Sequence, residues 1–405
     1  MARVLLLLPT ATYRAPDFLA GAAALGVEVV VACERRQALA GLMGERALRV
    51  DLRRPEAAAE TIVAAAERTP FDAVVAVDDQ GVLVAALAGQ RLGLAHNPPA
   101  AVAATRDKAV LRQALARAGV PQPVFRVASP DDDVAALARE VGLPCVVKPV
   151  SLSASRGVLR ADDPAAAAAA GARIRAMLAA DGAAPPTLLV EGYLAGGEVA
   201  VEGLLRDGAL DVLAVFDKPD PMEGPTFEET LLVTPSRLPQ GVQAAVTATV
   251  ADAAAAIGLR EGPVHAELRV TPEGTVGMLE LAARSIGGLC SRTLRFGLGL
   301  SLEEVILRHA LGLPLDALAA AFDAAGVLML PIPRAGTLVG VHGQDAARAV
   351  PGVAGVQMTV NPGRPVRPLP EGDRYLGFVF ARGETPEDVE RALRAAEERL
   401  EVEIA

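Results

Sequence analysis

Apolar and polar positions follow a strand-and-helix order over the first hundred residues. Short apolar runs have the length of buried strands, and segments with helical spacing separate them. The predicted strands are 4–8, 27–32 and 73–77, and the predicted helices are 16–25 and 56–68. This order predicts a doubly wound parallel sheet over residues 1–100. Its loops 10–14 and 78–81 follow strands, at the edge where open sheets of this kind bind ligands.

The pattern changes after residues 97–99. A helix with Asp107 near its start ends at about Ala118, before a glycine and two prolines, which marks a domain boundary. Up to about residue 315 strands and helices mix, with predicted strands at 145–148, 187–191 and 199–205 and a predicted helix at 247–257. Residues 316–405 resemble a small α+β cap, with predicted strands at 353–360 and 375–381 and a predicted helix at 387–400.

Composition narrows the class of protein. A chain of 405 residues is too long for one ordinary core, so we expect several domains. A formal charge of -10 without clustered Lys and Arg argues against nucleic acid as a partner. The longest apolar runs fall short of the roughly 20 residues that span a bilayer. The N-terminus resembles a first strand more than a signal peptide, so we expect a cytoplasmic protein. A homodimer is the default expectation.

Cysteine and lysine usage carry different amounts of information. Cys33, Cys145 and Cys290 are far apart and odd in number, which predicts buried small side chains and no disulfide or metal framework. Lys and Arg total 39, and lysine occurs only at three positions, which leaves 39 − 3 = 36 arginines. These lysines are Lys108, Lys148 and Lys218. Such a chain keeps lysine where a compact ammonium is needed, as in phosphate binding, unless the three are chance survivors.

The first chemical motif is a strand that ends in a lysine. Lys148 closes the apolar run that begins at Cys145, and a loop with three serines and a glycine follows. The loop residues are Ser151, Ser153, Ser155 and Gly157. Backbone N–H groups and hydroxyls can surround phosphoryl oxygens while the ammonium supplies a point charge. The alternative is a solvated lysine at the end of an ordinary strand.

The second motif is a strand, a turn and a second strand with carboxylates at both ends. Glu191, Tyr193 and Leu194 lie before the turn, and Glu198 follows it. Backbone groups in such a connection can hold a purine base, and a carboxylate can accept from both hydroxyls of the ribose. An ordinary hairpin with solvated glutamates is the alternative.

The third motif pairs two glutamates across a hairpin. A tight turn between two strands brings Glu267 and Glu280 together as cross-strand neighbours, and paired carboxylates beside a triphosphate bind Mg²⁺. Arg284 follows, with a planar fork that suits a substrate carboxylate or the transferring phosphoryl group. The loop after it contains Ser285, Gly287 and Gly288, which we assign to the substrate site.

In this order the motifs resemble the ATP-grasp superfamily over about residues 1–310. The resemblance implies an ATP-grasp catalytic region of two α+β subdomains at 101–315, with the nucleotide subdomain at about 120–195. By similarity Lys108 and Lys148 contact the nucleotide phosphates, Glu191 and the segment Tyr193–Leu194 the adenine, and Glu198 the ribose. Glu267 and Glu280 would hold Mg²⁺ or Mn²⁺.

Two departures from the family pattern affect this interpretation. Many members have asparagine two residues after the second metal-binding glutamate, where this chain has Ala282, so the number of metal ions is open. The phosphate loop also has a single glycine, Gly157, and depends more on its serines.

Within the superfamily the chain looks most like the L-amino acid ligases and carnosine-synthase-like enzymes. That likeness implies a carboxylic acid activated as an acyl phosphate, coupling to an amine, and release of ADP and phosphate. We assign catalysis to Lys148, Arg284 and His265, which would orient the donor or accept a proton, and further substrate contacts to Lys218 and Glu228. The alternatives are a formate or bicarbonate activator acting on a purine precursor, and a nucleotide-binding regulatory protein without turnover.

Overall fold

The computed structural model describes residues 1–10, 12–35, 43–180, 186–315 and 318–405. In this part of the chain an N-terminal parallel sheet has the strand order β3-β2-β1-β4, which confirms the predicted doubly wound arrangement. The strands are β1 (Arg3–Leu7), β2 (Glu28–Cys33), β3 (Ala47–Arg49) and β4 (Ala73–Ala76), and the helices are α1 (Ala15–Ala24), α3 (Pro55–Arg68) and α4 (Val82–Leu92).

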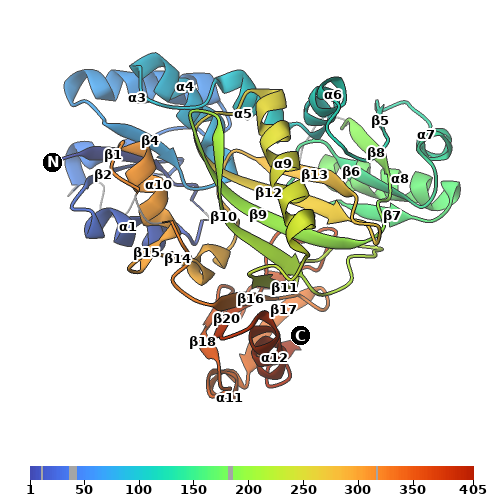
Figure 1. Ribbon diagram of the computed structural model, residues 1–405. Helices are drawn as coiled ribbons and strands as arrows, with labels where there is room; N and C mark the ends of the chain where they lie inside the picture. Colours follow the sequence, from blue (N-terminus) through green and yellow to red (C-terminus); the bar gives the residue numbers. More distant parts are fainter. Residues whose placement is uncertain (11, 36–42, 181–185, 316–317) are drawn as a thin grey trace.

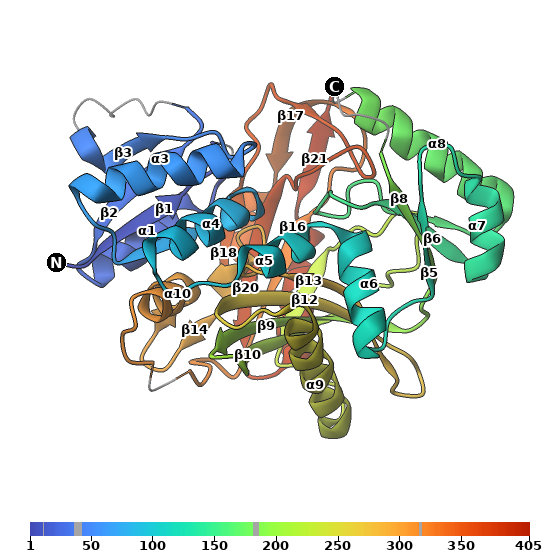
Figure 2. The same cartoon turned by 90° about the horizontal axis from the view of Figure 1, so that it is seen from above.

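Two helices lead from this sheet to the next unit (Figure 2). They are α5 (Pro99–Arg106) and α6 (Lys108–Ala118). Asp107 caps α6, because its carboxylate accepts hydrogen bonds from the backbone of Ala109 (2.9 Å) and Val110 (3.1 Å). Gly119, with a φ of 72°, ends the helix.

A small antiparallel sheet of order β5-β8-β6-β7 lies at the opposite end of the molecule from the N-terminal sheet (Figure 1). Its strands are β5 (Phe125–Ala128), β6 (Cys145–Pro149), β7 (Leu159–Ala161) and β8 (Leu188–Gly192), and its helices are α7 (Val134–Val141) and α8 (Pro164–Ala180). The helices pack on one face of this sheet and bury a separate apolar core.

The central sheet follows the order β13-β12-β9-β10-β11-β16-β20-β18 among the described residues. Its first five strands are β9 (Gly197–Arg206), β10 (Ala209–Lys218), β11 (Leu231–Thr234), β12 (Gly262–Val270) and β13 (Val276–Ala282), with α9 (Gln240–Ile257) packed against them. The hairpin of β12 and β13 aligns Glu267 with Glu280, as predicted for cross-strand neighbours.

The C-terminal segment continues this central sheet. Strands β16 (Ala324–Leu330), β18 (Val353–Met358) and β20 (Gly377–Gly383) extend it beyond β11, and α11 (Gln344–Arg348) and α12 (Pro386–Glu397) cover them. A second small sheet joins β17 (Gly336–His342), β19 (Pro365–Val366) and β21 (Glu401–Ile404). Before it come the short pair β14 (Arg295–Phe296) and β15 (Leu300–Ser301), and α10 (Leu302–Ala310).

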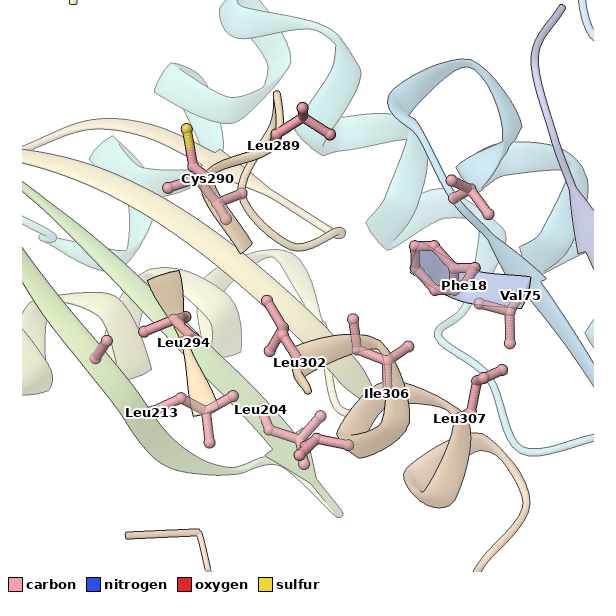
Figure 3. Close-up of a cluster of buried hydrophobic side chains, with 14 of the residues drawn as sticks. Phe18, Val75, Leu204, Leu213, Leu289, Cys290, Leu294, Leu302, Ile306 and Leu307 are labelled. Carbon is pink, nitrogen blue, oxygen red and sulfur yellow. The ribbon is translucent and has the colours of Figure 1, made fainter. Parts of the chain in front are cut away.

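One apolar core joins the N-terminal sheet to the central sheet. Figure 3 shows Phe18 and Val75 of the N-terminal unit facing Ile306 and Leu307 of α10, with Leu204 of β9 beyond them. All five side chains are buried. Burial of each such side chain contributes roughly 1.5–3 kcal/mol, so this core stabilises the junction between the two units. No helix in the described ranges is long and apolar enough to cross a membrane.

Candidate active site

A cavity of about 490 Å³ opens where the three units meet. Its walls come from the loops after β1 and β4, from the small sheet with its serine loop, from the β12–β13 hairpin and from the C-terminal segment. The lining includes most of the predicted site residues: Lys108, Lys148, Ser151, Ser153, Ser155, Glu191, Tyr193, Leu194, Glu198, His265, Glu267, Glu280, Arg284, Gly287 and Gly288. The sequence motifs therefore converge on one site.

Lys148 is held by a buried carboxylate. Its Nζ lies 2.7 Å from Glu191, whose other oxygen accepts a hydrogen bond from Arg112 Nε at 2.5 Å. Burial lowers the pKa of Lys148, and Glu191 opposes that effect. For Glu191 burial would raise the pKa, but Arg112 and Lys148 outweigh it and lower the pKa to about 2. The Glu191 side chain thus positions Lys148 in addition to lining the cavity.

Lys108, at the start of α6, contacts both the β12–β13 hairpin and the serine loop that follows Lys148. Its Nζ donates to the Leu152 carbonyl at 2.7 Å and lies 3.2 Å from Glu280. Ala154 and Ser155 have positive φ values of 56° and 53°, a backbone conformation that non-glycine residues seldom adopt. Gly157 lies outside the cavity lining, and its N–H donates to the Pro370 carbonyl at 3.0 Å.

Lys218 ends β10 beneath the cavity, among three carboxylates. Its Nζ bonds Glu198 at 2.6 Å, pairs with Glu229 and lies 3.4 Å from Glu267. Burial would lower the pKa of Lys218, but these carboxylates raise it well above its usual range. Oxygens of the three glutamates lie within 4.8 Å of one another, close enough to share a cation. Glu198 also accepts from Arg269 Nε at 3.0 Å.

His265 lies between two carboxylates that favour its protonated form. Its Nδ1 lies 2.5 Å from the fully buried Glu202, and its Nε2 lies 3.6 Å from Glu267. Burial would lower the pKa of this imidazole, but the hydrogen bonds to Glu202 and Glu267 raise it to about 9. Because contacts with Glu202 and Glu267 favour the protonated imidazole, they favour the orienting role among the two that the sequence suggested.

The cavity also has an apolar slot beside the small sheet. Tyr193 stacks with Phe227 at a centroid distance of 6.3 Å, and the Arg160 guanidinium lies over its ring at 4.6 Å. Leu194 packs against Gly277: a Cβ atom added at Gly277 would lie 2.6 Å from the Leu194 Cδ1. Val146 and Leu279 complete this part of the lining. This part of the lining is therefore mainly apolar and aromatic.

Arg284 faces the N-terminal unit. Its Nε lies 3.6 Å from Asp79, and its Nη1 donates to the Ser285 carbonyl at 3.0 Å. The Ser285 hydroxyl points away from the lining and accepts from Arg14 Nη2 at 2.8 Å. Arg14, with 1% of its surface exposed, also donates to the Val77 carbonyl at 2.9 Å.

Three predicted substrate residues, Lys218, Glu228 and Ser285, lie apart from the cavity lining, and several site residues were not predicted. Glu228 is half-buried outside the lining, while its neighbour Glu229 points into it. Arg14, Asp78 and Asp79 lie in loops 10–14 and 78–81, which the sequence placed at the ligand-binding edge. The unpredicted residues are Arg112, Glu202, Glu229, Arg269, Cys290, Met329 and Tyr375. Arg112 was detectable, because it lies four residues after Lys108 on one helix face.

Comparisons with known proteins agree with this arrangement. Residues 141–293 match the ATP-grasp domain, residues 19–96 the ATP-grasp N-terminal domain, and residues 328–405 the L-amino acid ligase C-terminal domain 2. The chain therefore belongs to the ATP-grasp superfamily, a class that includes ADP-forming ligases that make C–N bonds. Because of its C-terminal domain, it belongs to the L-amino acid ligase-like part of that superfamily.

Individual relatives are more distant. The chain is 28% identical to an alanine–anticapsin ligase of Bacillus subtilis, covering 62% of this chain and 56% of that protein. It is 32% identical to carnosine synthase 1 of Gallus gallus, covering 60% of this chain and 27% of that protein. The crystal structure of an L-amino acid ligase from Bacillus licheniformis superposes with a TM-score of 0.81 over 100% of this chain and 99% of that one, at 23% identity. At that identity the superposition shows the shared fold.

Proposed function

We propose that this protein is an ATP-dependent ligase that joins the carboxylate of one amino acid to the amine of another, with release of ADP and phosphate. The observation that carries the proposal is the convergence of Lys108, Lys148 and the Glu267–Glu280 pair on one cavity. These are the charges that phosphoryl transfer requires, held in place before the substrates arrive.

The reaction has two steps. A donor carboxylate oxygen attacks the γ-phosphorus of ATP, ADP leaves, and an acyl phosphate forms. The acceptor nitrogen then attacks the acyl carbon, phosphate leaves, and the nitrogen gives up a proton. Lys108 and Lys148 offset negative charge on the phosphoryl oxygens, and the serine loop over 151–158 excludes water that would hydrolyse the acyl phosphate. The cationic His265 orients the donor and balances Glu267.

The carboxylates fit a divalent cation. Glu267 and Glu280 are register partners, and oxygens of Glu198, Glu229 and Glu267 lie within 4.8 Å of one another around the Lys218 ammonium. Oxygen donors of this kind suit Mg²⁺ or Mn²⁺. When bound, the ion would polarise the phosphoryl oxygens and orient the triphosphate.

The C-terminal domain favours an amino acid as substrate over a purine precursor. Residues 328–405 match an L-amino acid ligase domain, and Tyr375 and Met329 from this segment line the cavity. Among the described residues, the part of the lining that comes from the C-terminal segment is Met329, Asp373 and Tyr375, which offers apolar surface and a negative charge to a ribose phosphate. A phosphorylated purine precursor would need cations there.

A coupled ADP-release assay over pairs of amino acids tests the proposal. We expect ADP only when a suitable acid and amine are both present, and Glu280→Gln to reduce its release on the order of 100-fold. The matched control is Glu273→Gln, in the exposed turn of the same hairpin, which should keep wild-type activity. Release of AMP in place of ADP, or binding of ATP without turnover on any pair, would contradict the ligase.

A further inference from the structure

The small sheet and its helices are joined to the rest of the molecule differently from the N-terminal sheet. Within the described ranges, the buried apolar cluster of this unit contains only residues 128–190, whereas the N-terminal and central sheets share the core in Figure 3. Units without a large shared apolar interface are expected to move relative to one another. Polar contacts therefore decide how firmly the serine loop is held over the cavity.

Residues 367–376, between β19 and β20, form a strap that reaches from the C-terminal segment to the serine loop. The far end of the strap is anchored, because the buried Leu376 donates its N–H to the Leu330 carbonyl of β16 at 2.9 Å. Pro370, in the middle of the strap, is also buried. The strap is thus fixed to the central sheet while it contacts the small one.

The contacts between the strap and the small-sheet unit come from its backbone and from one side chain. The Gly157 N–H donates to the Pro370 carbonyl at 3.0 Å, and Arg156 Nε donates to the Glu371 carbonyl at 3.2 Å. On α8, Arg173 holds the Glu371 carboxylate with Nε at 2.8 Å and Nη2 at 3.1 Å, a two-pronged geometry that fixes orientation as well as distance. All five residues lie outside the cavity lining.

We propose that the strap holds the serine loop closed over the nucleotide, with Glu371 and Arg173 as positioning residues that set how long the nucleotide stays bound. The positive φ values of Ala154 and Ser155 cost roughly 1–2 kcal/mol each, and such conformations persist only where surrounding contacts fix them. The strap supplies contacts of this kind to a loop that has one glycine. The inference requires nucleotide binding and no particular acid or amine.

A second attachment keeps the small sheet in place when the strap is loosened. On β7, the Arg160 N–H donates to the Pro225 carbonyl at 2.9 Å, and its Nη1 donates to the Glu223 carbonyl at 2.8 Å. Leu159 also forms a β-bridge with Thr226. Loss of the strap contacts should therefore change the rate of nucleotide release and leave the fold of the unit intact.

Stopped-flow release of a fluorescent ADP analogue, displaced by excess ADP with magnesium present, measures the residence time. We expect Glu371→Gln to speed release about threefold, since a partly exposed ion pair contributes little. Glu371→Arg places like charges together at Arg173 and should speed release about tenfold. Combining it with Arg173→Glu restores the pair in reverse and should return the rate to within about twofold of wild type.

The matched control is Glu140→Gln, which breaks an exposed pair with Arg126 between α7 and β5 of the same unit and should leave the release rate unchanged. Hydrogen–deuterium exchange of residues 151–158 in the ADP-bound protein should rise in Glu371→Arg and return to the wild-type level in the double variant.

The inference is overturned if ADP does not bind, if Glu371→Arg releases it at the wild-type rate, or if the exchanged pair does not restore the rate. An equal effect of Glu140→Gln would also overturn it. Because ADP is the only ligand in these measurements, their outcome is independent of whether any pair of amino acids is joined.

Discussion

Replacement of Glu191 by glutamine removes one charge from a buried triad and leaves its shape nearly intact. Glu191 has 2% of its surface exposed and bridges Arg112 and Lys148. Its pKa falls from 4.5 to about 2, which corresponds to about 3 kcal/mol of stabilisation at neutral pH. Loss of one partner from a buried ion pair costs about 3–5 kcal/mol, in the same range. We expect Glu191→Gln to lower the free energy of unfolding by about 3 kcal/mol.

Urea unfolding followed by circular dichroism measures this change, since the chain has no tryptophan for fluorescence. The matched control is Glu140→Gln in the same domain, whose partner Arg126 lies at 2.8 Å but at an exposed site. That variant should lose less than about 1 kcal/mol. The interpretation of Glu191 as a structural counter-ion would be refuted if the two variants lost equal stability.

The pH dependence of the same variant follows from the sign of the shift. A carboxyl with a depressed pKa in the folded state contributes its stabilisation above the unfolded value of 4.5. That contribution disappears as the pH falls through about 2. The difference in the free energy of unfolding between wild type and Glu191→Gln should therefore stay constant at about 3 kcal/mol from about pH 5 upward. It should shrink as the pH falls below about 4.5.

Two further variants test the local geometry. Lys148→Arg should reduce turnover on the order of 100-fold, because a guanidinium does not fit beside Glu191 and Arg112; near-normal turnover in the ADP assay would show that a compact ammonium is not required. Gly196→Ala should lose at least about 2 kcal/mol of stability by urea unfolding, since φ is +120° and a Cβ would lie 2.1 Å from the Val270 carbonyl oxygen. Gly197→Ala, where a Cβ meets nothing within 4 Å, should change stability by less than about 0.5 kcal/mol.

Local sequence signals identified the N-terminal sheet and many of the residues that line the cavity. Short apolar runs placed β1, β2 and β4, and the motif order placed Lys148 and the Glu267–Glu280 hairpin. Strand β16 was not predicted, although it lies between β11 and β20. Its sequence, alanine-rich and apolar throughout, has no alternation because the strand is buried on both faces.

Contacts between distant segments limited the prediction of side-chain partners. Glu198 was expected to accept from a ribose, yet in the structure it bonds Lys218 and Arg269. Lys218 lies 20 residues after Glu198 and Arg269 lies 71 residues after it. The register of β9 with β10 and β12 brings them together, and no single segment encodes that register.

Because all three lysines are buried, the exposed basic side chains of this protein are arginines and histidines. Lys108, Lys148 and Lys218 are each less than a tenth exposed, whereas Met1 at the amino terminus is 96% exposed. All other cationic side chains, apart from histidine, are arginines. A reagent that acylates lysine therefore meets Lys108 and Lys148 only through the cavity that they line, so a bound nucleotide would protect them.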